Sequence, residues 1–286
     1  MKKLTERLLI FFIGVPVFFI IIIFLPFYRH LVFNILVTLF SAAGAVELSA
    51  MFEKKQLHVS KTEAFIFGSL APLAATLTVC VNLPKWIVPL LIMAGVMWVL
   101  LSKAFTSQVK MENVINNIAA AFSVIAYPSF FLYWLIKMSI WENSGAIFLF
   151  LAIAFLNDST AWLAGNLFGK NNRGIIPASP NKSIAGFSGG LLVSIIIPAG
   201  TAILFPSVFS VLGNPVSLVK AIILGVFTSI FASLGDLSES AIKRSCDFKN
   251  SGSFFLERGG ILDSIDSVSI AAPVFYFLYT AFFFTA

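Results

Sequence analysis

The residues best suited to chemistry lie in two polar stretches between long apolar runs. The first stretch covers residues 157–190 and reads NDSTAWLAGNLFGKNNRGIIPASPNKSIAGFSGG. Its carboxylate, hydroxyl and cationic side chains, together with several glycines, form a mixture that suits phosphate groups. For the lysines taken singly, an ordinary basic cytoplasmic loop is the alternative. The candidate substrate- or phosphate-binding residues of this stretch are Asn157, Asp158, Lys170, Ser179, Lys182 and Ser183.

Two of these side chains are expected within the membrane. Asn157 and Asp158 fall in an apolar run, about two helical turns from its cytoplasmic end. Burying a carboxylate there costs several kcal/mol, so such residues are functional candidates first, and a hydrogen bond to a neighbouring helix is the structural alternative. Glu47 is a further carboxylate of this kind. We expect it either to face the same cavity or to extend towards the membrane interface.

The second polar stretch contains GDLSESAIKR at 235–244, DFKNSGS at 247–253 and RGGILDSIDS at 258–267. On a helix, Asp236, Glu239 and Lys243 share one face, and Asp263 and Asp266 are similarly spaced. Two acidic faces around a basic glycine-containing loop can hold a divalent cation through oxygen ligands. A simple i,i+4 pair between Glu239 and Lys243 is the structural alternative. We predict catalytic roles for Asp236, Glu239, Lys243, Asp263 and Asp266, and phosphate binding by Arg244, Lys249 and Arg258.

The elements that position these residues follow from composition. Hydrophobic residues make up 59% of the 286 positions and charged residues 11%, against about 45–50% and about 25% in soluble domains. Continuous apolar runs predict helices, because helices satisfy their own backbone groups in lipid. The expected fold class is all-α: a polytopic transmembrane bundle of about nine spans of roughly 20 residues each. The predicted spans cover residues 8–28, 31–52, 64–83, 86–105, 118–138, 144–165, 187–208, 217–237 and 265–285.

Loop charges predict the orientation of these spans. With the N-terminus inside, one side of the membrane collects 15 of the 19 Lys and Arg residues. Positive loops stay in the cytoplasm, so the N-terminus and both polar stretches are expected there, in a multi-pass protein of the cell inner membrane. This asymmetry accounts for the net charge of +6 without a nucleic-acid partner, and membrane lipids are the expected partners. We expect one membrane domain over 1–286, with mainly structural spans in 1–140 and a catalytic half in 141–286.

The two stretches together resemble the phosphatidate cytidylyltransferase family, also called CDP-diacylglycerol synthases. The family motif N-D-S/T-x-A-Y/W-x-x-G-R/N-x-F-G-K/R, followed by S-P-x-K-S/T, is matched at 157–170 and 179–183. The C-terminal signature G-D-L/I-x-E-S-x-x-K-R, K-D-x-G and P-G-H-G-G-x-L-D-R-x-D is matched in part. Its matching positions are residues 235–244 and Lys249, Gly252, Gly259, Gly260, Leu262, Asp263 and Asp266.

This resemblance implies an activity and its cofactors. CTP and phosphatidate would react to CDP-diacylglycerol and pyrophosphate, with the lipid phosphate attacking the α-phosphorus of CTP directly. The resemblance implies Mg²⁺ as cofactor, bound by Asp236 and Asp263, and allows a second, monovalent cation such as K⁺. A homodimer is compatible with the sequence.

Four departures from the family pattern keep alternatives open. Ala185 replaces a glutamate, Asn250 an aspartate, Leu256-Glu257-Arg258 a Pro-Gly-His and Ser264 an arginine. A related cytidylyltransferase acting on another lipid phosphate, such as that of an isoprenoid ether lipid, is the first alternative. A non-enzymatic binding protein or a transporter is the second. A transporter predicts repeated halves and polar sites at the bilayer centre, whereas this sequence shows no internal repeat.

Overall fold

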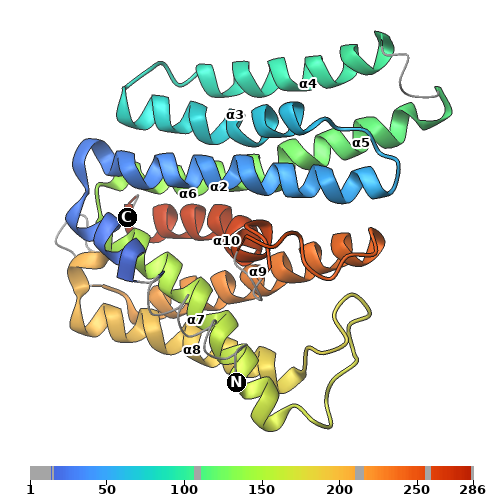
Figure 1. Cartoon of the computed structure of the whole chain (residues 1–286). Coiled ribbons are helices and arrows are strands. Elements are labelled where there is room, and N and C mark those ends of the chain that lie inside the picture. Colours follow the sequence, from blue (N-terminus) through green and yellow to red (C-terminus); the bar gives the residue numbers. More distant parts are fainter. Residues whose placement is uncertain (1–13, 15, 106–110, 210–215, 255–258, 285–286) are drawn as a thin grey trace. The chain divides into compact units, whose positions relative to one another are not determined.

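A computed structural model shows a chain built of helices (Figure 1). It describes residues 14, 16–105, 111–209, 216–254 and 259–284. Within these ranges there is no β-strand, and the only β-type pairing is an isolated antiparallel bridge between Arg173 and Ser183. The predicted all-α fold class is confirmed.

The helices coincide with the predicted apolar spans. Seven helical segments of the described chain are long and apolar enough to cross a membrane, and a shorter apolar helix covers Ile87–Ser102. The polytopic membrane architecture is therefore confirmed. Of the first predicted span, residues 14 and 16–28 are described and are helical at 14 and 16–24, whereas residues 8–13 and 15 lie outside the described residues. The α-helices are α2 (Phe27–Lys54), α3 (Lys61–Cys80), α4 (Ile87–Phe105), α5 (Val114–Val124), α6 (Phe131–Lys137), α7 (Ser144–Phe168), α8 (Ile184–Leu204), α9 (Leu218–Ser245) and α10 (Leu262–Tyr279).

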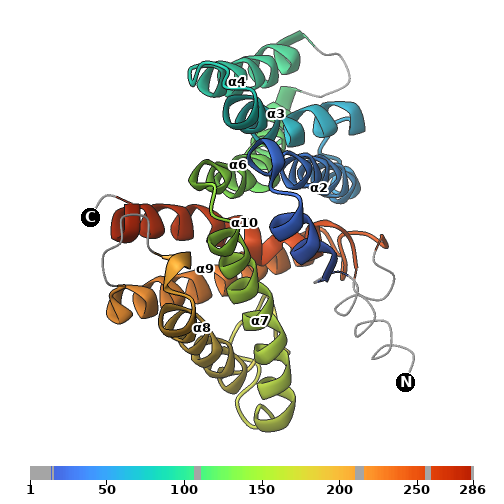
Figure 2. The same ribbon diagram turned by 90° about the vertical axis from the view of Figure 1, so that its left-hand side faces the viewer.

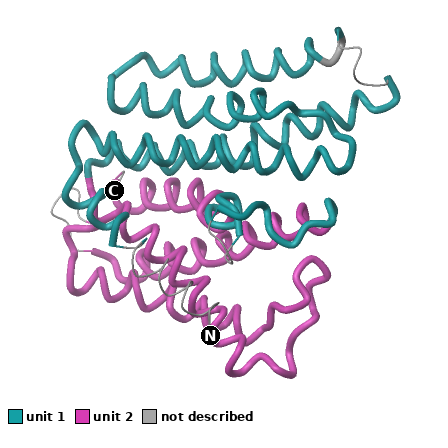
Figure 3. The backbone as a smooth tube through the Cα atoms, in the orientation of Figure 1, with its two compact units in different colours: residues 1–142, 245–265 teal, residues 143–244, 266–286 magenta. Residues whose placement is uncertain are grey.

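Contacts divide the chain into two compact units (Figure 3). The first unit contains residues 1–142 and 245–265, and the second contains residues 143–244 and 266–286. The first segment ends at Glu142, and the division into structural spans and a catalytic half near residue 140 stays a prediction. The short stretch 245–265, however, joins the N-terminal unit, a grouping that the sequence did not suggest.

In the first unit, α2 and α3 pack closely through small residues. A Cβ on Gly68 would lie 2.9 Å from the carbonyl oxygen of Ser41, so only glycine permits this approach. The hydroxyl of Ser41 donates to the Gly68 carbonyl at 2.6 Å. Helix α3 begins with a capping box, in which Ser60 and Glu63 satisfy each other's backbone N–H groups. Small side chains and hydroxyl hydrogen bonds are the usual means of joining helices in lipid.

In the second unit, α7 and α8 lie side by side (Figures 1 and 2). A Cβ on Gly186 would lie 2.8 Å from the Ala161 carbonyl oxygen, so glycine is needed where the two helices meet. Asn143 caps α7 by accepting the Ala146 N–H at 3.1 Å. Ser183 caps α8 by accepting the Gly186 N–H at 3.1 Å. Both are preferred N-cap residue types because their side chains satisfy N–H groups of the first turn.

Candidate active site

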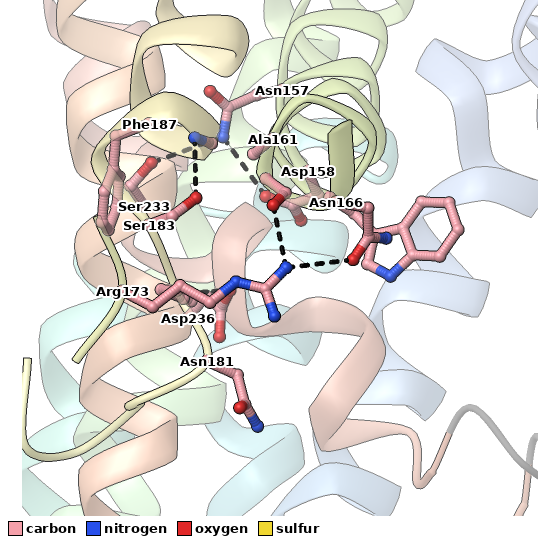
Figure 4. A pocket seen from close by; sticks show the side chains of 14 residues that line it. Asn157, Asp158, Ala161, Asn166, Arg173, Asn181, Ser183, Phe187, Ser233 and Asp236 are labelled. Carbon is pink, nitrogen blue, oxygen red and sulfur yellow. Dashed lines mark hydrogen bonds and ion pairs between the residues drawn. The ribbon is translucent and has the colours of Figure 1, made fainter. Parts of the chain in front are cut away.

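The second unit contains a polar pocket of about 380 Å³ (Figure 4). Helices α7 and α9, the start of α8 and the connection before α8 contribute its walls. Of the predicted site residues, Asn157, Asp158, Lys182, Ser183 and Asp236 line it. The structure thus brings together residues from both polar stretches. The remaining lining residues are Ala161, Trp162, Gly165, Asn166, Arg173, Asn181, Gly186, Phe187 and Ser233.

Asn157 and Asp158 are held by neighbouring helices. The Asn157 side chain is 1% exposed, and its Oδ1 accepts the Ser229 hydroxyl at 2.6 Å. Its amide nitrogen donates to Asp158 Oδ1 at 3.2 Å. The other oxygen of Asp158 accepts the Ser267 hydroxyl at 2.7 Å. The interhelical hydrogen bonds named as the structural alternative therefore exist, in a pocket wall that also contains charged groups.

Lys182 and Asp236 form an ion pair at the pocket. Lys182 Nζ lies 2.6 Å from Asp236 Oδ2, and the two side chains are 23% and 30% exposed. Lys182 is fixed by the connection before α8, where the bridge between Arg173 and Ser183 closes a hairpin. A partly exposed ion pair can exchange partners, because each charge retains access to an incoming ligand. This pair provides both a cation for phosphate and a carboxylate for a metal ion.

Arg173 is a pocket residue that the sequence reasoning had not placed among the site candidates. Its Nη2 donates to the Gly165 carbonyl at 2.8 Å and to Asn166 Oδ1 at 3.3 Å, as Figure 4 shows for Asn166. These bonds direct the guanidinium to the pocket, where it adds a second cation. The sequence signal was only its charge within a polar loop. Ser233 was also missed, although it precedes Asp236 by three positions and so lies on the same helical face.

Glu239, Lys243 and Asp266 are buried in the same unit but do not line the pocket. Glu239 is 0% exposed and forms an ion pair with Lys243, as the i,i+4 spacing predicts. Asp266 is 7% exposed and interacts electrostatically with Asp236, Glu239 and Asp158. Catalytic roles for these three residues stay predictions.

Other predicted residues lie away from the pocket lining. Lys170, Arg244 and Lys249 are exposed, and Ser179 is half-buried in the loop before α8. Arg258 lies outside the described residues. Ser264, where the family pattern has arginine, donates to the Gly260 carbonyl at 3.2 Å. Phosphate-binding roles for Lys170, Ser179, Arg244, Lys249 and Arg258 stay predictions.

Asp263 belongs to the first unit and organises the loop before α10. Its Oδ2 accepts the N–H of Ser251 at 2.8 Å, the Ser251 hydroxyl at 2.8 Å and the N–H of Gly260 at 2.7 Å. Gly259 has φ +113° and lies against this carboxylate, a conformation that L side chains rarely adopt. Asp263 is therefore oriented by its own loop.

Carboxylates are the side chains of this site that could hold a metal ion. In the described ranges, no group of three or more His, Cys, Asp or Glu side chains is arranged to bind a metal. Asp236 and Asp263 lie in different units, so their joint binding of a cation stays a prediction. Asp158 and Asp236 both line the pocket. Two carboxylates completed by phosphate oxygens and water are a common Mg²⁺ environment.

Comparison with known proteins places the chain in a family. The model of a family described as the cytidylyltransferase family matches residues 5–282. The chain belongs to the cytidylyltransferase family. The pocket residues Asn157, Asp158, Lys182 and Asp236 all fall within the matched range, so the pocket is part of the cytidylyltransferase region.

Curated relatives of this chain are named phosphatidate cytidylyltransferase. The Bacillus subtilis protein is 32% identical over 187 residues, which cover 64% of this chain and 66% of the relative. The Aquifex aeolicus protein is 31% identical over 168 residues, 58% of this chain and 59% of the relative. A Staphylococcus aureus protein is 40% identical over 124 residues, 43% and 44% of the two chains. These alignments span less than two thirds of each relative.

Proposed function

We propose that this protein transfers the cytidylyl group of CTP to phosphatidate, giving CDP-diacylglycerol and pyrophosphate for phospholipid biosynthesis. The observation that carries the proposal is the ion pair between Lys182 and Asp236 at a pocket of a membrane-embedded cytidylyltransferase-family protein. The curated relatives carry the name of this activity. Their identity to the chain supports the substrate assignment, and the pocket supports the chemistry.

The reaction joins two polyanions, so charge neutralisation and alignment are the main requirements. A phosphate oxygen of the lipid forms a bond to the α-phosphorus of CTP, and the bond to the β-phosphate oxygen breaks, releasing pyrophosphate. Lys182 and Arg173 supply positive charge at the pocket. Ser183 and the first turn of α8 add a hydroxyl and N–H groups suited to phosphate oxygens.

Mg²⁺ is the proposed cofactor, and the donor set fits it. Asp236 is the proposed ligand, with Asp158 beside it in the pocket wall. When bound, the ion would neutralise phosphate charge and polarise the attacked phosphorus. Asp263 as a second ligand and a monovalent cation such as K⁺ remain part of the proposal on the strength of the family resemblance.

The proposed site faces the cytoplasm of the cell inner membrane. The excess of Lys and Arg on one side of the predicted topology supports this orientation. Lys170, exposed in the loop before α8, provides the test. A Lys170→Cys variant in inverted membrane vesicles should react with a membrane-impermeant maleimide, and labelling only in right-side-out vesicles would reverse the orientation.

The activity is tested with the purified full chain in phospholipid nanodiscs. Labelled CTP, Mg²⁺ and phosphatidate are supplied, and CDP-diacylglycerol is followed by chromatography. An isoprenoid ether-lipid phosphate is offered in a parallel reaction. Product from phosphatidate supports the proposal, and product from the ether lipid alone would transfer the assignment to that substrate. No product from either lipid would reject the transferase function.

A further inference from the structure

A carboxylate from α2 accepts hydrogen bonds from the loop before α10. Glu47 Oε1 accepts the Ile261 N–H at 3.0 Å, and Oε2 accepts the Leu262 N–H at 2.9 Å. Oε2 also lies 2.9 Å from the Ser251 hydroxyl, whose single proton is shared between Glu47 Oε2 and Asp263 Oδ2. These partners lie 204 to 215 positions from Glu47 in sequence, and all belong to the first unit.

The contacts of Glu47 place a negative charge at the start of α10. The first N–H groups of a helix have no partner within the helix, and a nearby carboxylate stabilises them through charge-assisted hydrogen bonds and the helix dipole. Such a cap usually comes from a residue adjacent in sequence. Here the cap comes from another membrane helix, so it also ties the start of α10 to α2.

Ser251 connects Glu47 to Asp263. Its hydroxyl lies 2.9 Å from Glu47 Oε2 and 2.8 Å from Asp263 Oδ2. Its N–H donates to the same Asp263 oxygen at 2.8 Å. Both carboxylates therefore accept hydrogen bonds from the same loop, and displacing Glu47 leaves only the bonds to Asp263.

The loop glycines show how tightly the chain is fitted around Glu47. A Cβ on Gly252 would lie 2.5 Å from Glu47 Oε1. A Cβ on Gly260 would overlap both Glu47 Oε2 and the Ser251 hydroxyl. Two glycines from different parts of the loop thus meet the same carboxylate, which is the arrangement expected of a specific docking contact.

We propose that Glu47 is a positioning residue for the transfer reaction. It holds the loop around Ser251 and Gly260 and thereby fixes the carboxylate of Asp263, without itself contacting substrate. The inference rests on the proposed function for its catalytic part only. The loop contact itself is measurable without any substrate.

The first test measures amide hydrogen exchange on the full chain in nanodiscs. Glu47→Gln keeps the side-chain shape but removes the charge. It also places an NH₂ group, which cannot accept a hydrogen bond, opposite backbone N–H donors. Exchange in peptides containing Ser251, Ile261 and Leu262 should accelerate by about tenfold or more, since hydrogen bonds to charged groups are lost. Glu63→Gln, the same change in the capping box of α3, is the matched control and should affect exchange only at the start of α3.

The second test measures kcat and KM separately. Glu47→Gln should lower kcat by about 10- to 100-fold while the KM for CTP changes by less than about twofold, because alignment and not nucleotide affinity is lost. Glu47→Asp keeps the carboxylate and should recover part of kcat. Glu63→Gln should behave like the unmodified protein.

The outcomes separate the inference from the proposed function. Unchanged loop exchange in Glu47→Gln would overturn the contact. Faster exchange with unchanged kcat would overturn the positioning role. An inactive unmodified protein would reject the proposed transferase, and hydrogen exchange would still decide whether Glu47 holds the loop.

Discussion

Two aspartates of the same C-terminal signature, Asp236 and Asp263, have different surroundings. Asp236 pairs with the ammonium of Lys182 at 2.6 Å in the second unit. Asp263 accepts three hydrogen bonds on one oxygen from Ser251 and Gly260 in the first unit. The two residues are both predicted metal ligands, but they have different interaction partners in the structure. One faces a side-chain cation at a pocket, and the other orders the backbone around it.

This difference has a consequence for ligand binding. The partner of Asp236 is a long side chain, so a phosphate or metal ion can replace or join it when Lys182 changes its rotamer. Freeing Asp263 Oδ2 requires movement of the loop itself, because two of its three donors are backbone N–H groups. Substitutions at the two aspartates should therefore be distinguishable.

The largest effect is expected for Asp263→Asn. Turnover should be abolished. The free energy of unfolding of the full chain should fall by about 1–3 kcal/mol, because buried donors lose a charged acceptor. The protein should still insert and fold. Activity assays and thermal unfolding in detergent provide the measurement, and full stability together with full activity would remove Asp263 from both roles.

A large effect on activity alone is expected for Asp236→Asn. We expect kcat to fall by about 10³-fold, because a charge that organises the pocket is lost. Stability should change little, since the partner Lys182 is partly exposed and stays hydrated. Rate measurements are compared with unfolding in the same detergent. If Asp236→Asn destabilises the chain as much as Asp263→Asn, the contrast between the two aspartates is wrong.

Gly260→Ala should produce an intermediate effect. Its new methyl group would overlap Glu47 and Ser251, so we expect a loss of about 1–3 kcal/mol in unfolding free energy from overpacking. Gly200→Ala in α8 is the matched control, because a Cβ there meets nothing within 4 Å. Both variants are compared by thermal unfolding, and equal stabilities would argue against a close-fitting loop.

The smallest effect is expected at the loop surface. The hydrogen bond from Lys55, 2.7 Å away, lowers the pKa of Asp247 below its ordinary value of 3.8. Any stability from the pair is present above pH 3.8 and is lost as the pH falls through the lowered pKa, and it is close to zero because both side chains are exposed to water. Both side chains are exposed, so Asp247→Asn should leave activity and melting temperature at neutral pH unchanged. A clear drop in either would give this ion pair a larger role.

Much of the architecture was predictable from sequence. Apolar runs such as 144–165 and 217–237 predict the helices Ser144–Phe168 and Leu218–Ser245, because span length follows from bilayer thickness. The boundaries differ because a helix continues beyond the end of its apolar run, as α9 does through Lys243 to Ser245. The motif residues Asn157, Asp158, Lys182 and Asp236 line one pocket of the second unit, and their roles in binding and catalysis stay predictions.

Local sequence could not reveal long-range partners. Arg173 is one cation among several in its loop until its bond to the Gly165 carbonyl directs it to the pocket. Glu47 has no other charged residue within five positions in sequence, and its donors lie more than 200 positions away. Neither helix periodicity nor motif spacing contains that information.

The amino-acid sequence alone determined that the chain is helical and membrane-embedded, since hydrophobicity and length are local properties. It also predicted which residues bind phosphate, and those roles stay predictions. Only the tertiary structure decided how similar carboxylates are used. Hydrogen-bond partners depend on where distant backbone groups come to lie, so Asp236 meets a lysine at a pocket while Glu47 and Asp263 hold a loop.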